Sequence, residues 1–444
     1  MTTTTSVNAR VHSDVGDHLV PGSSFGKPVI VSGSNCEVTD TDGNTYLDLE
    51  AGPGVNSVGH CHPKVVAAIR EQAGLLLQGP GRNHSKLTSS LAERIGARVG
   101  EGHRQVFFTN SGAEANDGAI KLSMKHATVT GKKGYGIIAM EHSFHGRTSI
   151  GLSLTGNAGR KKGFGPYSSF PGVVHANAPY CYRCPHAAKN AAGKSCGLKC
   201  VDSIEDAITM RVPGEAAALI SESVLCVGGV LPPPAEYWPR VQEICRKHAI
   251  PLIMDEVFAG WGRTGKTFGF QNWDVEPDIV TFAKAIGGGV PLAGFVARRE
   301  IAQSFEEGDH FTTFGANNQI GMAAGHAVLN ILEDEKLSDN AKERGQQFVA
   351  GLQRLADRHP CIGDVRGIGL MIGVELVKDR NSKEPDPALT KAFQSELRKR
   401  GVMVSITGLY GCVVRITPPL TITAEQVDIA LSTMDDAFRA LEAK

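Results

Sequence analysis

The sequence has 444 residues, with 46 basic and 46 acidic side chains and therefore a formal net charge of zero. Without a basic excess, neither nucleic acid nor an anionic membrane surface is an expected partner, and no apolar stretch is long enough to cross a bilayer. Residues 1–18 lack the apolar core of a secretory signal and have the composition of a short disordered tail. We therefore expect a cytoplasmic protein with two or three globular domains.

The first two thirds of the chain alternate predicted strands with predicted helices. An apolar–polar alternation around Asp42-Gly43 indicates a hairpin, and residues 62–77 have the periodicity of a helix. Short apolar runs that end in polar residues follow, in the segments QVFFTNS, YGIIAME, AAALISE, IPLIMDE and DIVTFAK. A helical stretch, residues 235–249, lies between two of these runs. Alternation of this kind predicts a mostly parallel α/β sheet.

After Asn318 the pattern changes to two long helices, several short strands and a final helix behind a threonine cap. This pattern predicts a smaller α+β domain. We expect residues 1–57 to pack with this small domain, residues 58–318 to form the large domain, and residues 319–444 to complete the small one.

Five of the predicted strands end at residues that suit a binding site. In open α/β sheets, ligands bind at the carboxyl ends of the strands. Five residues occupy such ends here, and we expect them to converge on one cleft: Ser111, Phe144, Glu222, Asp255 and Lys284. A single acid at a strand end is usually a cap or a surface residue, so it is the joint placement that favours a binding site.

Two glycine-containing motifs allow more than one interpretation. Ser111, Gly112 and Ala113 would place backbone N–H groups at a helix N-terminus, which suits either a phosphate or an ordinary strand-to-helix turn. The segment GWGRTGKT at residues 260–267 matches the P-loop pattern, with an acidic strand end just before it. A P-loop must join a strand to a helix, and the residues after Thr267 have no helical pattern. We therefore reject nucleotide hydrolysis.

Four of the ten cysteines are clustered, with C-x-x-C spacing at Cys181 and Cys184 and C-x-x-x-C spacing at Cys196 and Cys200. This spacing suits a structural zinc site, but it also suits reduced thiols in a loop near the active site or a regulatory disulfide. The other six are scattered, as in reduced intracellular proteins. The sequence leaves these alternatives open, and we assign no metal ligands.

Taken in order, several segments resemble the class III, fold type I aminotransferases, which depend on pyridoxal phosphate. The resemblance covers nearly the whole chain, through YLDLEAGPGVNSVGHCHP, FFTNSGAEANDGAIKL, FHGRT, IMDEVFAGWGRTG, TFAKAIGGGVPLAG and VVRITPPLTIT. It implies a large cofactor-binding domain with a mostly parallel sheet. It also implies a smaller α+β domain that is built from the C-terminus and the N-terminal segment.

The resemblance also implies how a pyridoxal phosphate cofactor would be held. Lys284 matches the lysine that forms the Schiff base, and Asp255 matches the carboxylate that pairs with the pyridine nitrogen. Val257 and Phe144 would pack on the two faces of the ring.

The phosphate of the cofactor would lie at residues 111–113, so the resemblance favours Ser111, Gly112 and Ala113 as phosphate ligands. Thr313 matches a threonine that reaches the phosphate of the neighbouring subunit. A homodimer, or a dimer of dimers, with two shared sites is therefore implied.

Three charged residues match the substrate-binding residues of the family. Arg415 resembles the clamp for the α-carboxylate, Arg147 the arginine that holds a distal carboxylate, and Glu222 the acid that can neutralise Arg415. The implied reaction moves an amino group from an amino acid, or from an ω-amino acid such as 4-aminobutyrate, to a 2-oxo acid such as 2-oxoglutarate or pyruvate.

Two alternatives keep the cofactor and change the reaction, namely activity like that of dialkylglycine decarboxylase and amino-acid racemisation. Arg147 argues against the decarboxylase. The chain also departs from the family pattern at three positions, where Phe258 replaces a glutamine, Asn318 a proline, and Pro53 an expected aliphatic residue.

Overall fold

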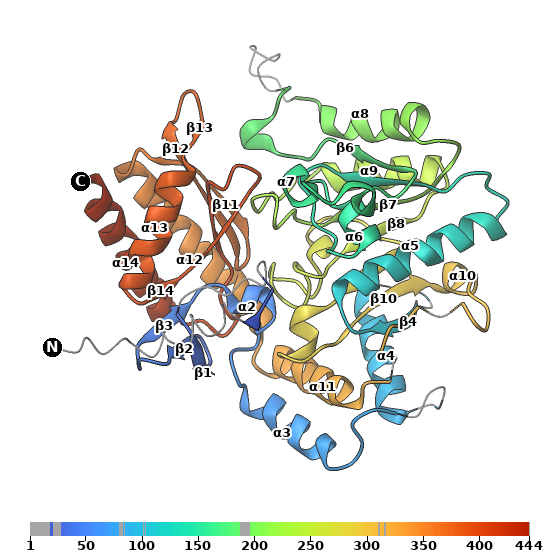
Figure 1. The fold of residues 1–444 in the computed structure, drawn as a ribbon, viewed down its shortest axis with the longest axis horizontal. Helices are drawn as coiled ribbons and strands as arrows, with labels where there is room; N and C mark the ends of the chain where they lie inside the picture. Colours follow the sequence, from blue (N-terminus) through green and yellow to red (C-terminus); the bar gives the residue numbers. More distant parts are fainter. Residues whose placement is uncertain are drawn as a thin grey trace.

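The computed structural model describes residues 18–20, 28–79, 83, 85–100, 102, 104–186, 196–309, 311–314 and 317–443. The disordered tail predicted at residues 1–18 lies outside these residues apart from His18. Figure 1 shows a larger group of elements on the right, in blue through green and yellow to orange, and a smaller group in orange and red on the left, with the first strands of the chain beside the smaller group. Among the described residues, every helix is too short or too polar to span a membrane.

A seven-stranded sheet lies at the centre of the larger group (Figure 1). Its strands, in spatial order, are β4 (Arg104–Thr109), β10 (Ala293–Arg298), β9 (Ile279–Phe282), β8 (Leu252–Asp255), β7 (Ala216–Glu222), β5 (Gly136–Met140) and β6 (Val173–Ala176). β10 runs antiparallel to both neighbours, and the other adjacent pairs are parallel. The predicted mostly parallel α/β sheet is therefore confirmed.

Apolar composition explains the position of this sheet. Every residue of β5, β7, β8 and β9 is buried, as expected for parallel strands covered on both faces.

The helices of this part are α3 (Pro63–Ala73), α4 (Lys86–Val99), α5 (Gly112–Val129), α6 (Ser149–Leu154), α7 (Ala158–Lys161), α8 (Lys199–Asp206), α9 (Tyr237–Lys247) and α10 (Arg299–Ala302). The short helical segments are η1 (Gly165–Ser168), η2 (Cys181–Arg183), η4 (Ala207–Arg211), η5 (Gly269–Asn272) and η6 (Lys284–Gly287).

The smaller group contains two further sheets and the long helices α12 (Leu337–Arg358), α13 (Pro387–Lys399) and α14 (Ala424–Glu442). One sheet has the order β1 (Ile30–Ser34), β2 (Glu37–Asp40), β3 (Thr45–Asp48) and β14 (Val402–Met403). The other has the order β11 (Ile362–Ile368), β12 (Met371–Asp379), β16 (Val413–Ile416) and β15 (Ser405–Thr407), with β13 (Glu384–Pro385) paired to β12. The short helix α2 (Ala51–Gly54) follows β3, and α11 (Gln319–Asp334) lies beside α3 under the larger group (Figure 1).

Pairing between distant segments joins the N-terminal strands to the C-terminal part. β14 pairs in parallel with β3, with Val402 opposite Leu47, and both residues belong to one apolar core. α11 contributes to both main cores, because Met322 packs in the core around the large sheet and Val328 in the core of the smaller group. The division of the chain at residues 57 and 318 stays a prediction.

The segment that matched the P-loop pattern is a buried turn after β8. Thr267 is followed by the single turn η5 rather than by an α-helix, as the rejection of nucleotide hydrolysis required. Glu256 accepts hydrogen bonds from Gly269 N at 2.6 Å and Phe270 N at 2.9 Å. Arg263 is fully buried, and it donates to Leu370 O, Pro418 O and Ser57 Oγ. Arg263 thus joins this turn to the C-terminal part of the molecule.

Candidate active site

A cavity of about 480 Å³ lies at the carboxyl ends of the parallel strands. Ser111, Phe144, Glu222, Asp255 and Lys284 all line it, although they follow five different strands of the sheet. The strand ends thus meet at one place, as the topology rule for open sheets predicts. Further lining residues come from the same turns, namely Gly112, Ala113, Arg147, Val257 and Phe258.

Lys284 occupies a strained backbone position within this cavity. It follows β9 and starts η6 with φ at +53°, a region that side chains other than glycine rarely adopt. Its Nζ lies 4.2 Å from the centre of the Phe258 ring. Burial lowers the pKa of Lys284, and the charge of Arg415 acts in the same direction. The amine therefore loses its proton more readily than an exposed lysine does.

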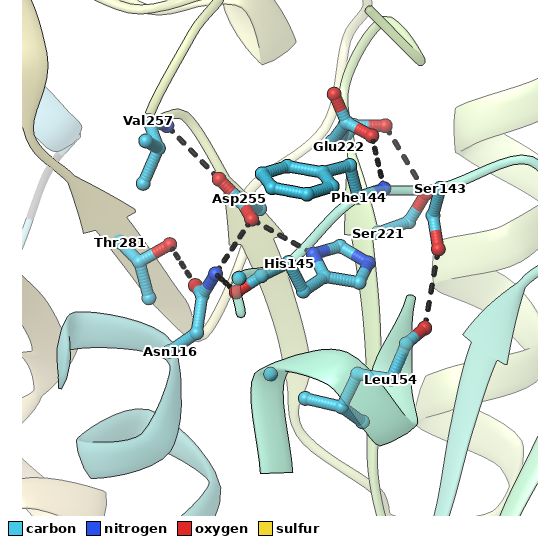
Figure 2. Close-up of polar contacts among 12 residues, drawn as sticks. Asn116, Ser143, Phe144, His145, Leu154, Ser221, Glu222, Asp255, Val257 and Thr281 are labelled. Atoms are coloured by element: carbon cyan, nitrogen blue, oxygen red, sulfur yellow. Dashed lines mark hydrogen bonds and ion pairs between the residues drawn. The ribbon is translucent and has the colours of Figure 1, made fainter. Parts of the chain in front are cut away.

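Asp255 is 2% exposed and is held by a network of hydrogen bonds (Figure 2). Its Oδ2 accepts from Asn116 Nδ2 at 2.8 Å and lies 2.8 Å from His145 Nδ1, and its Oδ1 accepts from Val257 N at 3.0 Å. Asn116 is itself oriented by Thr281, whose hydroxyl donates to Asn116 Oδ1 at 2.7 Å. These contacts fix the carboxylate in position.

Neither Asn116 nor His145 was predicted from the sequence. Both lie inside motifs that were singled out, the segments NSGAEAN and FHGRT. Their polar character inside buried turns was a usable signal. Only the folded structure, however, shows that α5 and the turn after β5 both reach Asp255 at the end of β8.

The N-terminus of α5 forms one wall of the cavity. Ser111 is the N-cap, and its hydroxyl accepts from Glu114 N at 3.3 Å. A Cβ on Gly112 would lie 2.7 Å from Val257 Cγ1, so only glycine fits between this helix and the turn after β8. The first backbone N–H groups of a helix have no partner within it, so this wall suits an anion.

Thr313 lies apart from the cavity lining. It is exposed, and its hydroxyl contacts Glu114 Oε1 of its own chain. Gly315 and Ala316, which follow in the sequence, lie outside the described residues.

Glu222 and Arg415 are close to the same cavity but do not pair with each other in the described chain. Glu222 accepts from Phe144 N and from Cys226 N, each at 2.9 Å (Figure 2 shows the first). Burial, reinforced by the negative charge of Asp255, raises the pKa of Glu222 to about 7. In this conformation each carboxylate oxygen of Glu222 accepts a hydrogen bond from a backbone amide, and the neutralisation of Arg415 by Glu222 stays a prediction.

Arg415 is 7% exposed and is held by neutral groups. Its Nη2 donates to Ser405 Oγ at 3.1 Å, and its Nη1 lies 3.7 Å from Cys226 Sγ. Its guanidinium carbon lies 5.1 Å from the centre of the Phe258 ring. Phe258 therefore faces two cations, Lys284 and Arg415, where the family pattern has a hydrogen-bonding glutamine.

The other two departures lie outside the cavity. Asn318 caps α11, because its side chain accepts from Gly321 N at 3.0 Å and donates to Pro291 O at 2.9 Å. A proline could make neither bond. Pro53 is exposed.

The clustered cysteines line a second pocket of about 250 Å³. All four are free thiols, and among the described residues no group of three or more potential ligands is arranged to hold a metal ion. The neighbouring Tyr180 and Arg183 contact the buried Glu375 of β12, each at 2.5 Å. This cysteine loop therefore connects the two parts of the molecule.

Comparison with known proteins agrees with the geometry. The sequence matches the family described as Aminotransferase class-III over residues 24–438. It is 39% identical to the acetylornithine aminotransferase of Methanothermobacter thermautotrophicus, over 92% of this chain and 93% of that protein. It is 36% identical to the diaminobutyrate–2-oxoglutarate aminotransferase of Haemophilus influenzae, over 88% of this chain and 86% of that protein.

A solved structure extends the comparison to the fold. The (S)-enantioselective ω-transaminase of Thermomicrobium roseum has a TM-score of 0.89 and 34% identity, and the match covers 98% of this chain and 100% of that one. The names of these proteins support transamination over decarboxylation or racemisation. With this match over nearly its whole length, the chain belongs to the class-III aminotransferases, a family of enzymes that depend on pyridoxal phosphate.

Proposed function

We propose that this aminotransferase takes its amino group from an amino acid or an ω-amino acid and delivers it to 2-oxoglutarate or pyruvate. The observation that carries the proposal is the shared cavity, which holds a lysine of lowered pKa, a fixed carboxylate and an anion-binding helix end. The donors named for the two sequence relatives, acetylornithine and diaminobutyrate, support a substrate with a terminal amino group.

The residues of the cavity fit pyridoxal phosphate. Gly112 leaves a space that a Cβ would fill, beside Val257, and the helix end at Ser111, Gly112 and Ala113 offers N–H groups to a phosphate. Phe144 and Val257 provide apolar surfaces for the two faces of a ring. When bound, the cofactor supplies an electrophilic carbonyl and a cationic ring that withdraws electrons from the substrate.

Lys284 and Asp255 would carry the chemistry. Lys284, with its lowered pKa, can hold the cofactor covalently and then move a proton to and from the substrate Cα. Asp255 would keep the pyridine nitrogen protonated, since Asn116, His145 and the amide of Val257 stabilise its negative charge.

The two arginines would select the substrate. Arg415, which is buried, would bind the α-carboxylate, and Arg147, at the exposed rim, would bind a distal carboxylate. Glu222 would neutralise Arg415 only after leaving its two backbone amides. Its pKa of about 7 implies that this change depends on pH near neutrality.

Arg415→Ala should impair the half-reaction with the 2-oxo acid most. The expected loss is about 2–5 kcal/mol, because the α-carboxylate of the bound substrate would lose its buried charged partner. Arg147→Ala should impair dicarboxylic substrates and leave monocarboxylic ones nearly unchanged. A panel of pyruvate, 2-oxoglutarate and glyoxylate, with cofactor absorbance followed for each half-reaction, measures both effects. If neither variant alters the selectivity between mono- and dicarboxylic acceptors, the roles of the two arginines are wrong.

The proposed assembly is a homodimer or a dimer of dimers, in which Thr313 of one subunit serves the phosphate of the other. The exposure of Thr313 supports this role, because an exposed threonine can be reached by a second subunit. The proposed location is the cytoplasm, where ten free thiols remain reduced.

Mixing Lys284→Ala subunits with Thr313→Ala subunits should restore activity, although each variant alone is inactive or nearly so. In the mixed dimer one site has both residues intact and the other has both replaced. Activity should therefore approach half the wild-type value per dimer after subunit exchange, which mass measurement verifies. Activity no greater than the sum of the parents, in confirmed mixed dimers, would show that Thr313 acts within its own chain or has no role.

A further inference from the structure

Two arginines reach the same aromatic ring at the edge of the active-site cavity. The guanidinium carbon of Arg147 lies 5.7 Å from the centre of the Phe144 ring, and that of Arg160 lies 5.2 Å from it. Both distances are within the range of a cation–π contact. Arg147 follows β5, whereas Arg160 belongs to α7, so the fold brings two separate segments to this ring. Phe144 itself lines the cavity.

The positive charges at this ring lack an acidic partner in the part of the chain that the structure describes. Neither Arg147 nor Arg160 forms an ion pair there, and the Nε atom of Arg160 is buried without a hydrogen-bond partner. Burial lowers the pKa of Arg160, and the charges of Arg147 and Arg415 add to the effect. A half-buried cation that is surrounded by like charges is stabilised when an anion binds between them.

We propose that Arg160 is a second substrate-binding residue, which together with Arg147 holds the distal carboxylate of a dicarboxylic substrate against the ring of Phe144. This inference rests on the proposed role of the cavity, in which Arg415 takes the α-carboxylate. A second carboxylate then extends away from Lys284 toward the rim. Two guanidinium groups offer it several N–H donors in fixed planes, while Phe144 keeps both side chains in place.

A specific contact of Arg160 with the carboxylate must be distinguished from a general effect of positive charge at the rim. Lys162 supplies a matched control, because it lies two residues along the chain, is exposed and carries the same charge. Arg160→Gln and Lys162→Gln therefore remove equal charge from neighbouring positions. Arg160→Lys retains the charge but removes the planar fork, and thermal melting of each variant verifies that it remains folded.

Binding is measured on the holoenzyme by titrating its visible absorbance with glutarate, an unreactive dicarboxylate, and with butyrate as the monocarboxylate. Arg160→Gln should raise the Kd of glutarate about tenfold, as expected for the loss of a hydrogen bond between charged groups, and should leave that of butyrate within about twofold. Arg160→Lys should give a smaller rise, and Lys162→Gln almost none. KM for 2-oxoglutarate should follow the same order, with KM for pyruvate unchanged.

The double variant Arg147→Gln, Arg160→Gln tests whether the two side chains hold one carboxylate. Their effects on glutarate should then be clearly non-additive. Equal effects of Arg160→Gln and Lys162→Gln, or equal effects on glutarate and butyrate, would overturn the proposal. So would unchanged glutarate binding with a weakened dimer, which would show that Arg160 pairs with an acid of another subunit. If instead the wild type binds glutarate but transaminates no acceptor, the proposed function fails and the binding result for Arg160 stands.

Discussion

Lys284→Ala should lower turnover by at least about 10⁴-fold, the upper end of what a positioned proton-transfer group contributes, because this lysine would also hold the cofactor. The protein should remain folded. The Lys284 side chain lines a cavity rather than filling a core. The backbone strain at φ +53° is similar for lysine and alanine, so the substitution adds little of it. Turnover with a good donor and 2-oxoglutarate measures the first effect, and thermal melting measures the second.

Lys266→Ala is the matched control for this experiment. Lys266 is exposed and belongs to the segment that matched the P-loop pattern, so its loss should change neither activity nor stability. Loss of activity in Lys266→Ala, or substantial turnover in Lys284→Ala, would contradict the assignment of the reactive amine.

Asp255→Asn should retain cofactor but lose activity by about 10²–10³-fold, comparable to the removal of one electrostatic stabiliser from an active site. A neutral amide cannot hold the pyridine nitrogen in its protonated form. It would also present an N–H₂ group to Asn116 Nδ2 or His145 Nδ1, where a carboxylate now accepts hydrogen bonds. The absorbance of bound cofactor and the turnover number of the same preparation measure the two effects.

Glu256→Gln separates catalysis from local stability, because Glu256 is the adjacent buried carboxylate and contacts the backbone amides of Gly269 and Phe270 and the side chain of Ser223. Burial raises the pKa of Glu256 to about 7, so the neutral form is already accessible to it near neutral pH. This variant should change the melting temperature and leave turnover per folded enzyme nearly unchanged. Near-normal turnover of Asp255→Asn would show that another group partners the ring nitrogen.

The sequence was sufficient to predict the sheet and the convergence of its strand ends. Buried runs such as IPLIMDE and DIVTFAK are continuous in apolar residues, and the topology rule for open sheets then places Asp255 and Lys284 at one cleft. The antiparallel β10 was not anticipated, because periodicity does not report the direction of a strand. The three-way domain division stays a prediction, since α11 packs against both cores.

The details of the site depended on tertiary packing. Contacts between distant segments produce three of these details. They are the strained φ of Lys284, the hydrogen bonds of Asp255 with Asn116 and His145, and the hydrogen bonds that Glu222 accepts from backbone amides. Arg160 gave no signal in the sequence, because a basic residue in a glycine-rich segment is usually an exposed loop residue. Its proximity to Phe144 is visible only once α7 has folded onto the rim.

Reduction of the yellow holoenzyme with borohydride, followed by peptide mapping, tests the central claim most directly. Borohydride fixes the cofactor to the amine that holds it, so the label reports the reactive lysine without reference to any substrate. We predict one label per chain, on the peptide that contains Lys284, and no label in Lys284→Ala. Label on a different lysine of the wild-type protein, or a fully active enzyme that takes up none, would contradict the account.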